Sequence, residues 1–304
     1  MVEATFENIY GTPPEELVGA YAGAQQFSPL TPGAEILELV APASLDNFAM
    51  LTPAGTVERR CAMALALRAL RPGAPLIALA PKDKGGSRIA QDLKELGCSP
   101  DEAARRHHRI CTTTARGDEK AIARAIDEGK PQYLEDLGLW SQPGVFSWNR
   151  IDPGSALLLK HLPALSGSGA DFGCGIGVLA RAVLGSPKVA QLTMIDIDRR
   201  AIDMVRRNID DPRVALVWAD ARTVAEVSGL DFVVMNPPFH EGATENQALG
   251  QSFIRRAATA LRNGGTCWLT ANRHLPYEAI LKPLFRNVKL IAEAEGYKIY
   301  QAQK

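Results

Sequence analysis

The 304-residue sequence contains few cysteines, and their spacing excludes two classes of small domain. The five are scattered, odd in number and never arranged as a C-x-x-C pair. Disulfide scaffolds carry even sets of closely spaced cysteines, and structural zinc sites carry paired ones. We therefore expect buried thiols, no disulfide framework and no metal site. The five positions are Cys61, Cys98, Cys111, Cys174 and Cys267.

The sequence also lacks an uninterrupted apolar run long enough to cross a bilayer. Its first 14 residues hold no basic-then-apolar segment and instead carry Glu3 and Glu7. We expect a cytoplasmic protein without a membrane partner. The sequence leaves the oligomeric state open, and a monomer is the simplest expectation.

An excess of positive charge is missing as well, because 34 Lys and Arg residues balance 34 Asp and Glu residues. A protein held on nucleic acid by diffuse charge is basic, so a nucleic-acid partner would have to meet a local patch. The most basic stretches of the first half are Lys82, Lys84 and Arg88, and the run 105–109. They are either a solvated face or a surface that contacts phosphates.

The length and the hydrophobic content of 46% indicate one large or two ordinary globular domains. The segment 140–144, Trp-Ser-Gln-Pro-Gly, is the best boundary signal, so we predict domains at 1–140 and 141–304. In the first domain, residues 1–33 are expected to form a lid or packing segment. The regular pattern after them predicts strands at 35–40, 75–80 and 108–112 and helices at 57–70 and 88–96, the second capped by Ser87.

The second half begins with an acid, three alternating glycines and the start of a helix. Asp171 ends a short apolar run, Gly173, Gly175 and Gly177 follow, and a helical pattern begins at Val178. Glycines are needed where a bulky adenosyl ligand contacts the backbone, because a Cβ would fill its space. A dinucleotide fingerprint would require glycine in place of Val178.

Strand and helix patterns then alternate, and polar residues stand where several strands end. Ligands bind beyond the carboxyl ends of the strands in such sheets. Asp196 is placed to accept from both hydroxyls of a ribose, whereas Asp198 is more plausibly a helix cap. Asp220 can accept from an adenine amine while the Ala221 N–H meets a ring nitrogen. The strands are expected at 191–195, 214–219, 232–235, 267–270, 288–292 and 297–301, the last two as an antiparallel hairpin at one edge.

The sequence Asn236-Pro237-Pro238-Phe239 follows the strand expected at 232–235. The Asn236 amide oxygen and the Pro237 carbonyl can each accept one N–H of an aromatic amine and turn its lone pair toward a methyl donor. Pro237 and Pro238 hold the backbone rigidly, and Phe239 can stack on the base. In the preceding segment, Asp152 is expected to cap a helix or to lie beside the donor.

The glycine motif resembles motif I of the class I S-adenosylmethionine-dependent methyltransferases. The string 236–242, with 144–147, 154–155 and 271–277, resembles the ribosomal RNA guanine-N2 methyltransferases, especially the small-subunit enzyme. The resemblance implies a Rossmann-like seven-stranded α/β sheet, preceded by a smaller, degenerate copy of the same fold that assists with RNA. It implies a donor site formed by Asp171, Phe172, Gly173, Cys174, Gly175, Gly177, Asp196, Ile197, Asp220, Ala221 and Asn236.

The activity implied by this resemblance is methyl transfer from S-adenosylmethionine to the exocyclic N2 amine of a guanine in ribosomal RNA or a ribosomal subunit. Two alternatives remain open from the residues themselves. One is transfer to another amino acceptor, either adenine in nucleic acid or a protein glutamine. The other is a protein that binds the donor and recognises RNA without turnover.

Overall fold

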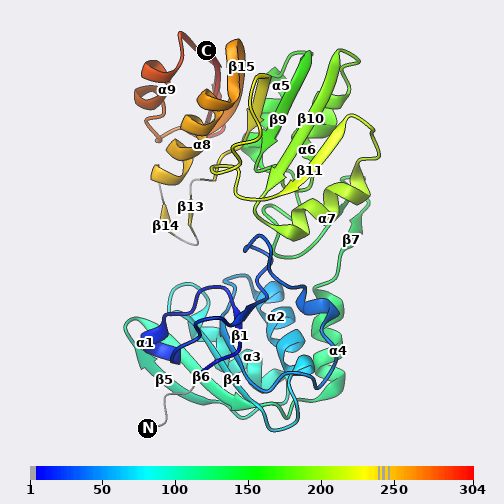
Figure 1. Ribbon diagram of the computed structural model, residues 1–304, viewed down its shortest axis with the longest axis vertical. Helices are drawn as coiled ribbons and strands as arrows, with labels where there is room; N and C mark the ends of the chain where they lie inside the picture. Colours follow the sequence, from blue (N-terminus) through cyan, green and yellow to red (C-terminus); the bar gives the residue numbers. More distant parts are fainter. Residues whose placement is uncertain (1–4, 239, 242–243, 246) are drawn as a thin grey trace. The chain divides into compact units, whose positions relative to one another are not determined.

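The computed structural model describes residues 5–238, 240–241, 244–245 and 247–304. The chain divides into two compact units, Met1–Pro131 and Gln132–Lys304, each with its own sheet (Figure 1). No helix within the described ranges has the length and apolar character needed to cross a membrane.

The first unit is built on a six-stranded sheet of order β2-β1-β3-β4-β6-β5. Strands β1 to β4 are parallel neighbours, whereas β6 runs antiparallel to both β4 and β5. The strands are β1 (Asn8–Tyr10), β2 (Gln25–Gln26), β3 (Phe48–Leu51), β4 (Pro75–Pro81), β5 (Asp101–Arg105) and β6 (His108–Thr114). The helices are α1 (Glu15–Val18), α2 (Thr56–Ala69), α3 (Ile89–Glu95) and α4 (Glu119–Glu128), with short 3-10 turns at Leu37–Leu39 and Gly86–Arg88.

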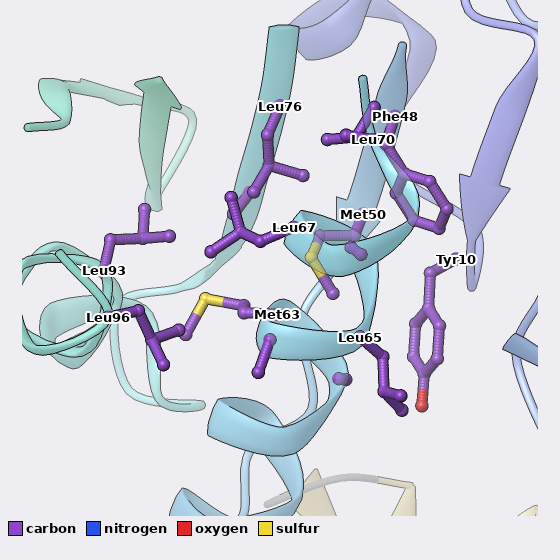
Figure 2. Close-up of a cluster of buried hydrophobic side chains, with 14 of the residues drawn as sticks. Tyr10, Phe48, Met50, Met63, Leu65, Leu67, Leu70, Leu76, Leu93 and Leu96 are labelled. Atoms are coloured by element: carbon purple, nitrogen blue, oxygen red, sulfur yellow. The ribbon is translucent and has the colours of Figure 1, made fainter. Parts of the chain in front are cut away.

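Helix α2 forms the centre of the main core of this unit. Met63 and Leu67 lie on it among side chains of β3, β4 and α3 (Figure 2). A second buried feature is an ion pair in which Arg59 Nε lies 2.7 Å from Asp92 Oδ2. Arg59 Nη1 also donates to the Ala54 carbonyl at 2.8 Å, directly after β3. Removing one partner of a buried ion pair leaves an uncompensated charge, so this contact fixes α2, α3 and the loop after β3 together.

The start of the chain corrects part of the predicted pattern. Residues 35–40 do not form a strand but surround a 3-10 turn, and residues 8–10 and 25–26 supply the strands instead. These strands have three and two residues, too few to show an alternating pattern, so the sequence predicted only a lid or packing segment for residues 1–33. The cap predicted at Ser87 is also wrong, because Arg88 occupies the N-cap of α3 without a side-chain hydrogen bond. The predictions for 57–70, 75–80 and 108–112 are confirmed.

The second unit contains a seven-stranded sheet of order β11-β10-β9-β12-β15-β17-β16. The first five strands in this order are parallel, and the hairpin β16–β17 runs antiparallel at the edge, as predicted. The strands are β9 (Gly167–Phe172), β10 (Val189–Asp196), β11 (Val214–Trp218), β12 (Leu230–Met235), β15 (Leu261–Asn272), β16 (Asn287–Ala294) and β17 (Tyr297–Gln303). Two small hairpins, β7 (Gln132–Leu134) with β8 (Leu139–Ser141) and β13 (His240–Glu241) with β14 (Thr244–Glu245), complete the strands.

Helices cover both faces of this sheet and give it the three-layer form of a Rossmann-like domain. One face carries α8 (Gln247–Ala260) and α9 (Glu278–Leu284), and the other carries α5 (Pro153–His161), α6 (Val178–Leu184) and α7 (Arg199–Asn208). The glycines of β9 have a packing reason, because a Cβ on Gly169 would lie 2.2 Å from the Phe232 ring on β12. The Phe232 ring occupies the space that a branched side chain at position 169 of β9 would need.

The two units share one topology. In each, a central strand is parallel to a neighbour on either side, and the sheet ends in an antiparallel pair. Strands β1, β2, β3, β4, β5 and β6 thus correspond to β9, β10, β12, β15, β16 and β17. The first unit has no counterpart of β11 among its described strands. The prediction of a smaller, degenerate methyltransferase-like domain before a seven-stranded one is confirmed.

Candidate active site

The three glycines after β9 adopt backbone conformations that other residues avoid. Gly173, Gly175 and Gly177 have φ angles of 74°, 52° and 91°, in the left-handed region. A Cβ on Gly177 would lie 3.0 Å from Ile209 Cδ1, whereas a Cβ on Gly175 would meet no atom within 4 Å. Gly177 is therefore needed for packing and Gly175 for an open space beside the turn. An open space at the end of such a strand is a place where an adenosyl ligand can contact the backbone.

Asp171 presents a carboxyl group that the protein itself does not satisfy. Its side chain is fully buried, and neither oxygen has a hydrogen bond of ordinary geometry within the described chain. Burial, and next the charge of Asp196, raise its pKa to about 8, although the nearby Ala180 N–H offsets part of this effect. A cationic ligand beside this group would restore its ionised form.

Phe172 and Cys174 contribute to the turn through packing. The Phe172 ring lies in the core, where the Arg256 guanidinium is 6.0 Å from its centre. Cys174 donates its N–H to the Ile195 carbonyl at 3.1 Å, and its thiol is buried. Burial, with the charges of Asp196 and Asp171, raises the pKa of this thiol well above its usual value. Both side chains are buried in this structure.

Asp196 ends β10 next to the glycine turn. Its Oδ2 accepts the Gly175 N–H at 2.8 Å, and its Oδ1 accepts the Asp198 N–H at 2.9 Å. Burial raises its pKa to about 6, despite these hydrogen bonds. Ile197, the next residue, is 37% exposed and offers an apolar surface at the same strand end.

Asp198 is confirmed as a helix cap. Its Oδ1 accepts the Arg200 N–H at the start of α7, and both carboxylate oxygens bind the Arg200 guanidinium at 2.9 and 3.0 Å. This pair is buried. A fully engaged side chain of this kind is a weak candidate for a ribose ligand.

Asp220 lies at the predicted place after β11, where its carboxylate forms an ion pair with Arg222 that the sequence analysis did not predict. Arg222 donates to both of its carboxylate oxygens, at 2.6 to 2.9 Å, and donates its backbone N–H as well. Although burial opposes it, these hydrogen bonds and the charge of Arg222 hold the pKa of Asp220 below its usual value. The N–H of Ala221 makes no hydrogen bond within the described chain, so this group remains a candidate for an adenine nitrogen.

Asn236 follows β12, which lies beside β9 with Met235 opposite Phe172. Asn236 and the glycine turn therefore follow directly after paired residues of two adjacent strands, and these strands lie about 5 Å apart. The amide nitrogen donates to Asp152 Oδ2 at 2.8 Å and to Ser155 Oγ at 2.9 Å. Pro237 is buried and Pro238 is half-buried. Phe239 lies outside the described residues.

The contact between Asp152, Ser155 and Asn236 is the feature of this site that the sequence pattern did not predict. Asp152 does cap α5 as expected, because its Oδ2 accepts the Ser155 N–H at 2.9 Å. The acid directly before Pro153 is the sequence signal for this cap. No pattern in the sequence indicates that the same oxygen reaches a residue 84 positions away.

Comparisons with known proteins identify the family of this chain. Residues 136–301 match the methyltransferase small domain family. A ribosomal RNA small subunit methyltransferase C of Shewanella loihica is 32% identical over 79% of this chain and 72% of its own length. The protein of the same name from Pseudomonas putida KT2440 is 29% identical over 97% of this chain and 94% of its own length.

Among solved structures, a 16S rRNA guanine N2 methyltransferase of T. thermophilus, in complex with AdoMet and guanosine, superposes with a TM-score of 0.73. This alignment covers 93% of this chain and 77% of the other, at 24% identity, and supports the shared two-domain fold. The family predicted from the glycine and Asn-Pro-Pro motifs is confirmed. The chain belongs to the methyltransferase small domain family and has the ribosomal RNA small subunit methyltransferases C as its relatives.

Proposed function

We propose that the second unit transfers a methyl group from S-adenosylmethionine to the exocyclic N2 amine of a guanine in small-subunit ribosomal RNA. The observation that carries this proposal is the Asn236 amide, held by its nitrogen beside the glycine turn. Its oxygen is left to accept a hydrogen bond, which an amine can donate. The names of the curated relatives support the choice of ribosomal RNA.

The residues around the turn fit the proposed donor. Gly175 leaves space for the adenosyl group, and the carboxyl groups of Asp171 and Asp196 are suited to a ligand with positive charge. S-adenosylmethionine, when bound, supplies a methyl group on a sulfonium that is already activated for displacement. Asp196 would accept from the ribose hydroxyls, and Ile197 would cover the adenine.

Asn236 and Pro237 perform the part of the reaction that concerns the acceptor. The lone pair of a guanine amine is delocalised into the ring, so the amine must be turned before it can attack. Asn236 Oδ1 and the Pro237 carbonyl each accept one N–H, which directs the lone pair toward the methyl group. The amine becomes cationic as the new bond forms, and it then loses its surplus proton to solvent.

We also propose that the first unit assists RNA recognition and carries no donor site. Residues 11–14, between β1 and α1, hold a single glycine, Gly11, with a left-handed φ of 72°, whereas three glycines lie between β9 and α6. The loop between β4 and α3 carries Lys82, Lys84 and Arg88, which we call the basic loop. Lys82 and Arg88 are exposed, as phosphate contacts require.

Labelled S-adenosylmethionine, offered with separate pools of ribosomal RNA, DNA and ribosomal proteins, tests the proposal. We expect label in ribosomal RNA, and N2-methylguanosine after digestion to nucleosides. Label found only in methyladenosine, in DNA or in protein glutamine would show that the acceptor is not a guanine of ribosomal RNA. Donor binding without label in any pool would indicate a binding protein instead. Assembled small subunits and free RNA, tested side by side, identify the form of substrate.

A further inference from the structure

The Asn236 amide is held by two partners that both belong to the first turn of α5. Asp152 is the N-cap of this helix, and Ser155 is its third residue. Asp152 Oδ2 accepts both the Ser155 N–H and the Asn236 Nδ2–H, at 2.9 and 2.8 Å. Ser155 Oγ accepts the second Nδ2–H at 2.9 Å. Both protons of the amide nitrogen are therefore engaged.

This arrangement determines which end of the amide faces the acceptor. A carboxylate accepts hydrogen bonds and has no proton to donate. If the amide turned over, Asn236 Oδ1 would lie against Asp152 Oδ2, and two acceptors would repel each other at hydrogen-bond distance. The nitrogen therefore faces α5 and the oxygen faces away from it. A site with a fixed acceptor oxygen selects a group with N–H donors and disfavours a carbonyl.

The start of α5 reaches Asn236 because Gly154 allows a close approach to the sheet. A Cβ on Gly154 would lie 2.7 Å from the Tyr297 ring on β17 and 3.0 Å from Thr270 Oγ1 on β15. Any larger residue would force the helix start away from these strands. Gly154 and Ser155 are both buried. Helix α5 is thus placed by packing, independently of any ligand.

We infer that Asp152 and Ser155 are positioning residues that lock the Asn236 amide with its oxygen toward the acceptor amine. This inference rests on the proposed function and assigns a second task to the cap of α5. The charge on Asp152 also polarises the amide, because hydrogen bonds in a chain strengthen one another at low dielectric. Asn236 Oδ1 becomes a better acceptor as the amine gains positive charge, so the effect falls on kcat.

Three substitutions separate the lock from the cap. Ser155→Ala removes one hydrogen bond to Asn236 and leaves the backbone cap intact, since the cap uses the Ser155 N–H. Asp152→Ser keeps a capping side chain but loses the carboxylate that meets Asn236. Asp152→Asn keeps an oxygen for both contacts and removes the charge.

We expect kcat to fall about fivefold in Ser155→Ala, from one neutral hydrogen bond, and about ten- to a hundredfold in Asp152→Ser, from one charge-assisted bond. Asp152→Asn should lie between Asp152→Ser and the native protein. The KM for RNA and the affinity for the donor should stay unchanged in all three. Ser186→Ala is the matched control, because Ser186 is another buried serine of this unit whose Oγ donates to a backbone carbonyl, that of Leu165 at 2.6 Å.

A measurement without turnover provides the decisive readout. The Asn236 side-chain NH2 protons give a pair of amide signals in NMR, identified by their loss in Asn236→Ala. These protons should exchange slowly with solvent in the native protein and rapidly in Ser155→Ala and Asp152→Ser. Fast exchange in the native protein, or exchange that neither substitution changes, would overturn the lock.

The two proposals fail in different ways. If Asn236→Ala retains full turnover, the proposed role of Asn236 in the reaction is wrong, whatever the NMR result. If Asn236→Ala abolishes turnover while Asp152→Ser keeps native kcat, Asp152 only caps α5 and the lock is refuted. A change in the KM for RNA alone, with native kcat in the Asp152 and Ser155 variants, would also refute the lock. Holding the Asn236 amide in place acts on the chemical step and therefore on kcat.

Discussion

Replacing Asp171 by asparagine should stabilise the second unit near neutral pH, although it changes a residue of the proposed donor site. The pKa of Asp171 is raised from 3.8 to about 8 because the group is buried and lies close to Asp196. The folded chain thus binds a proton more tightly than the unfolded chain does. This group contributes its full stability below pH 3.8, and that stability is lost as pH rises toward 8.

The size of the effect at pH 7 follows from the distance to the unfolded pKa. Roughly 3 pH units separate 3.8 from 7, and each unit corresponds to about 1.4 kcal/mol, which gives an upper bound of about 4 kcal/mol. Asparagine removes this cost but brings an amide nitrogen into a place without partners, at about 1–3 kcal/mol. We expect a net gain of about 1–3 kcal/mol at pH 7 and a loss of about 1–3 kcal/mol near pH 4.

Urea unfolding followed by tryptophan fluorescence measures this effect in the intended unit. All four tryptophans lie in the second unit, at positions 140, 148, 218 and 268. Unfolding midpoints of the native and Asp171→Asn proteins, taken from pH 4 to 8 without donor, should cross as pH rises. A stability difference that does not depend on pH, or a variant that is less stable at pH 7, would refute this account of Asp171.

Three further predictions concern the donor, the RNA and the sheet. Asp196→Ala should weaken S-adenosylmethionine binding by about 1.5–3 kcal/mol in calorimetry, the cost of losing a charged hydrogen-bond partner; native affinity would remove Asp196 from the site. Replacing the three residues of the basic loop by alanine should raise the KM for RNA and flatten its salt dependence, with donor affinity unchanged. The same salt slope as the native protein would instead indicate that RNA contacts the edge of the catalytic domain near Arg255, Arg256, Arg273 and His274. Gly169→Ala should cost about 1–3 kcal/mol of unfolding free energy through its clash with Phe232, and Phe232→Leu should restore part of it.

The sequence predicted the second unit well because its signals are local. Strands buried on both faces appear as apolar runs, and the acids or amide after them mark the strand ends where the site forms. The glycine turn and the cap by Asp198 also depend on neighbouring residues only. Each of these predictions concerns residues within one strand, turn or helix start.

Most of the predictions that failed or were missing depend on contacts between distant segments. Strands β1 and β2 are too short to be recognised before their neighbours are known. The hydrogen bonds from Asn236 to Asp152 and Ser155 join residues more than 80 positions apart. The engagement of Asp220 by Arg222 is local, but a pair two residues apart has no helix or strand pattern that would announce it. The contacts between distant segments follow from the sheet order and from packing, which one sequence does not display.

The contacts of Arg59 distinguish the loop after β3 from the corresponding loop after β12. Ala54 is the third residue after β3, as Pro238 is the third residue after the corresponding strand β12. In the first unit, the chain's own guanidinium lies on that loop and is anchored by Asp92. A nucleobase could enter there only by displacing a buried ion pair, at about 3–5 kcal/mol. The loop after β3 is therefore occupied by a side chain of this chain, so we expect any ligand of the first unit to bind elsewhere on that unit.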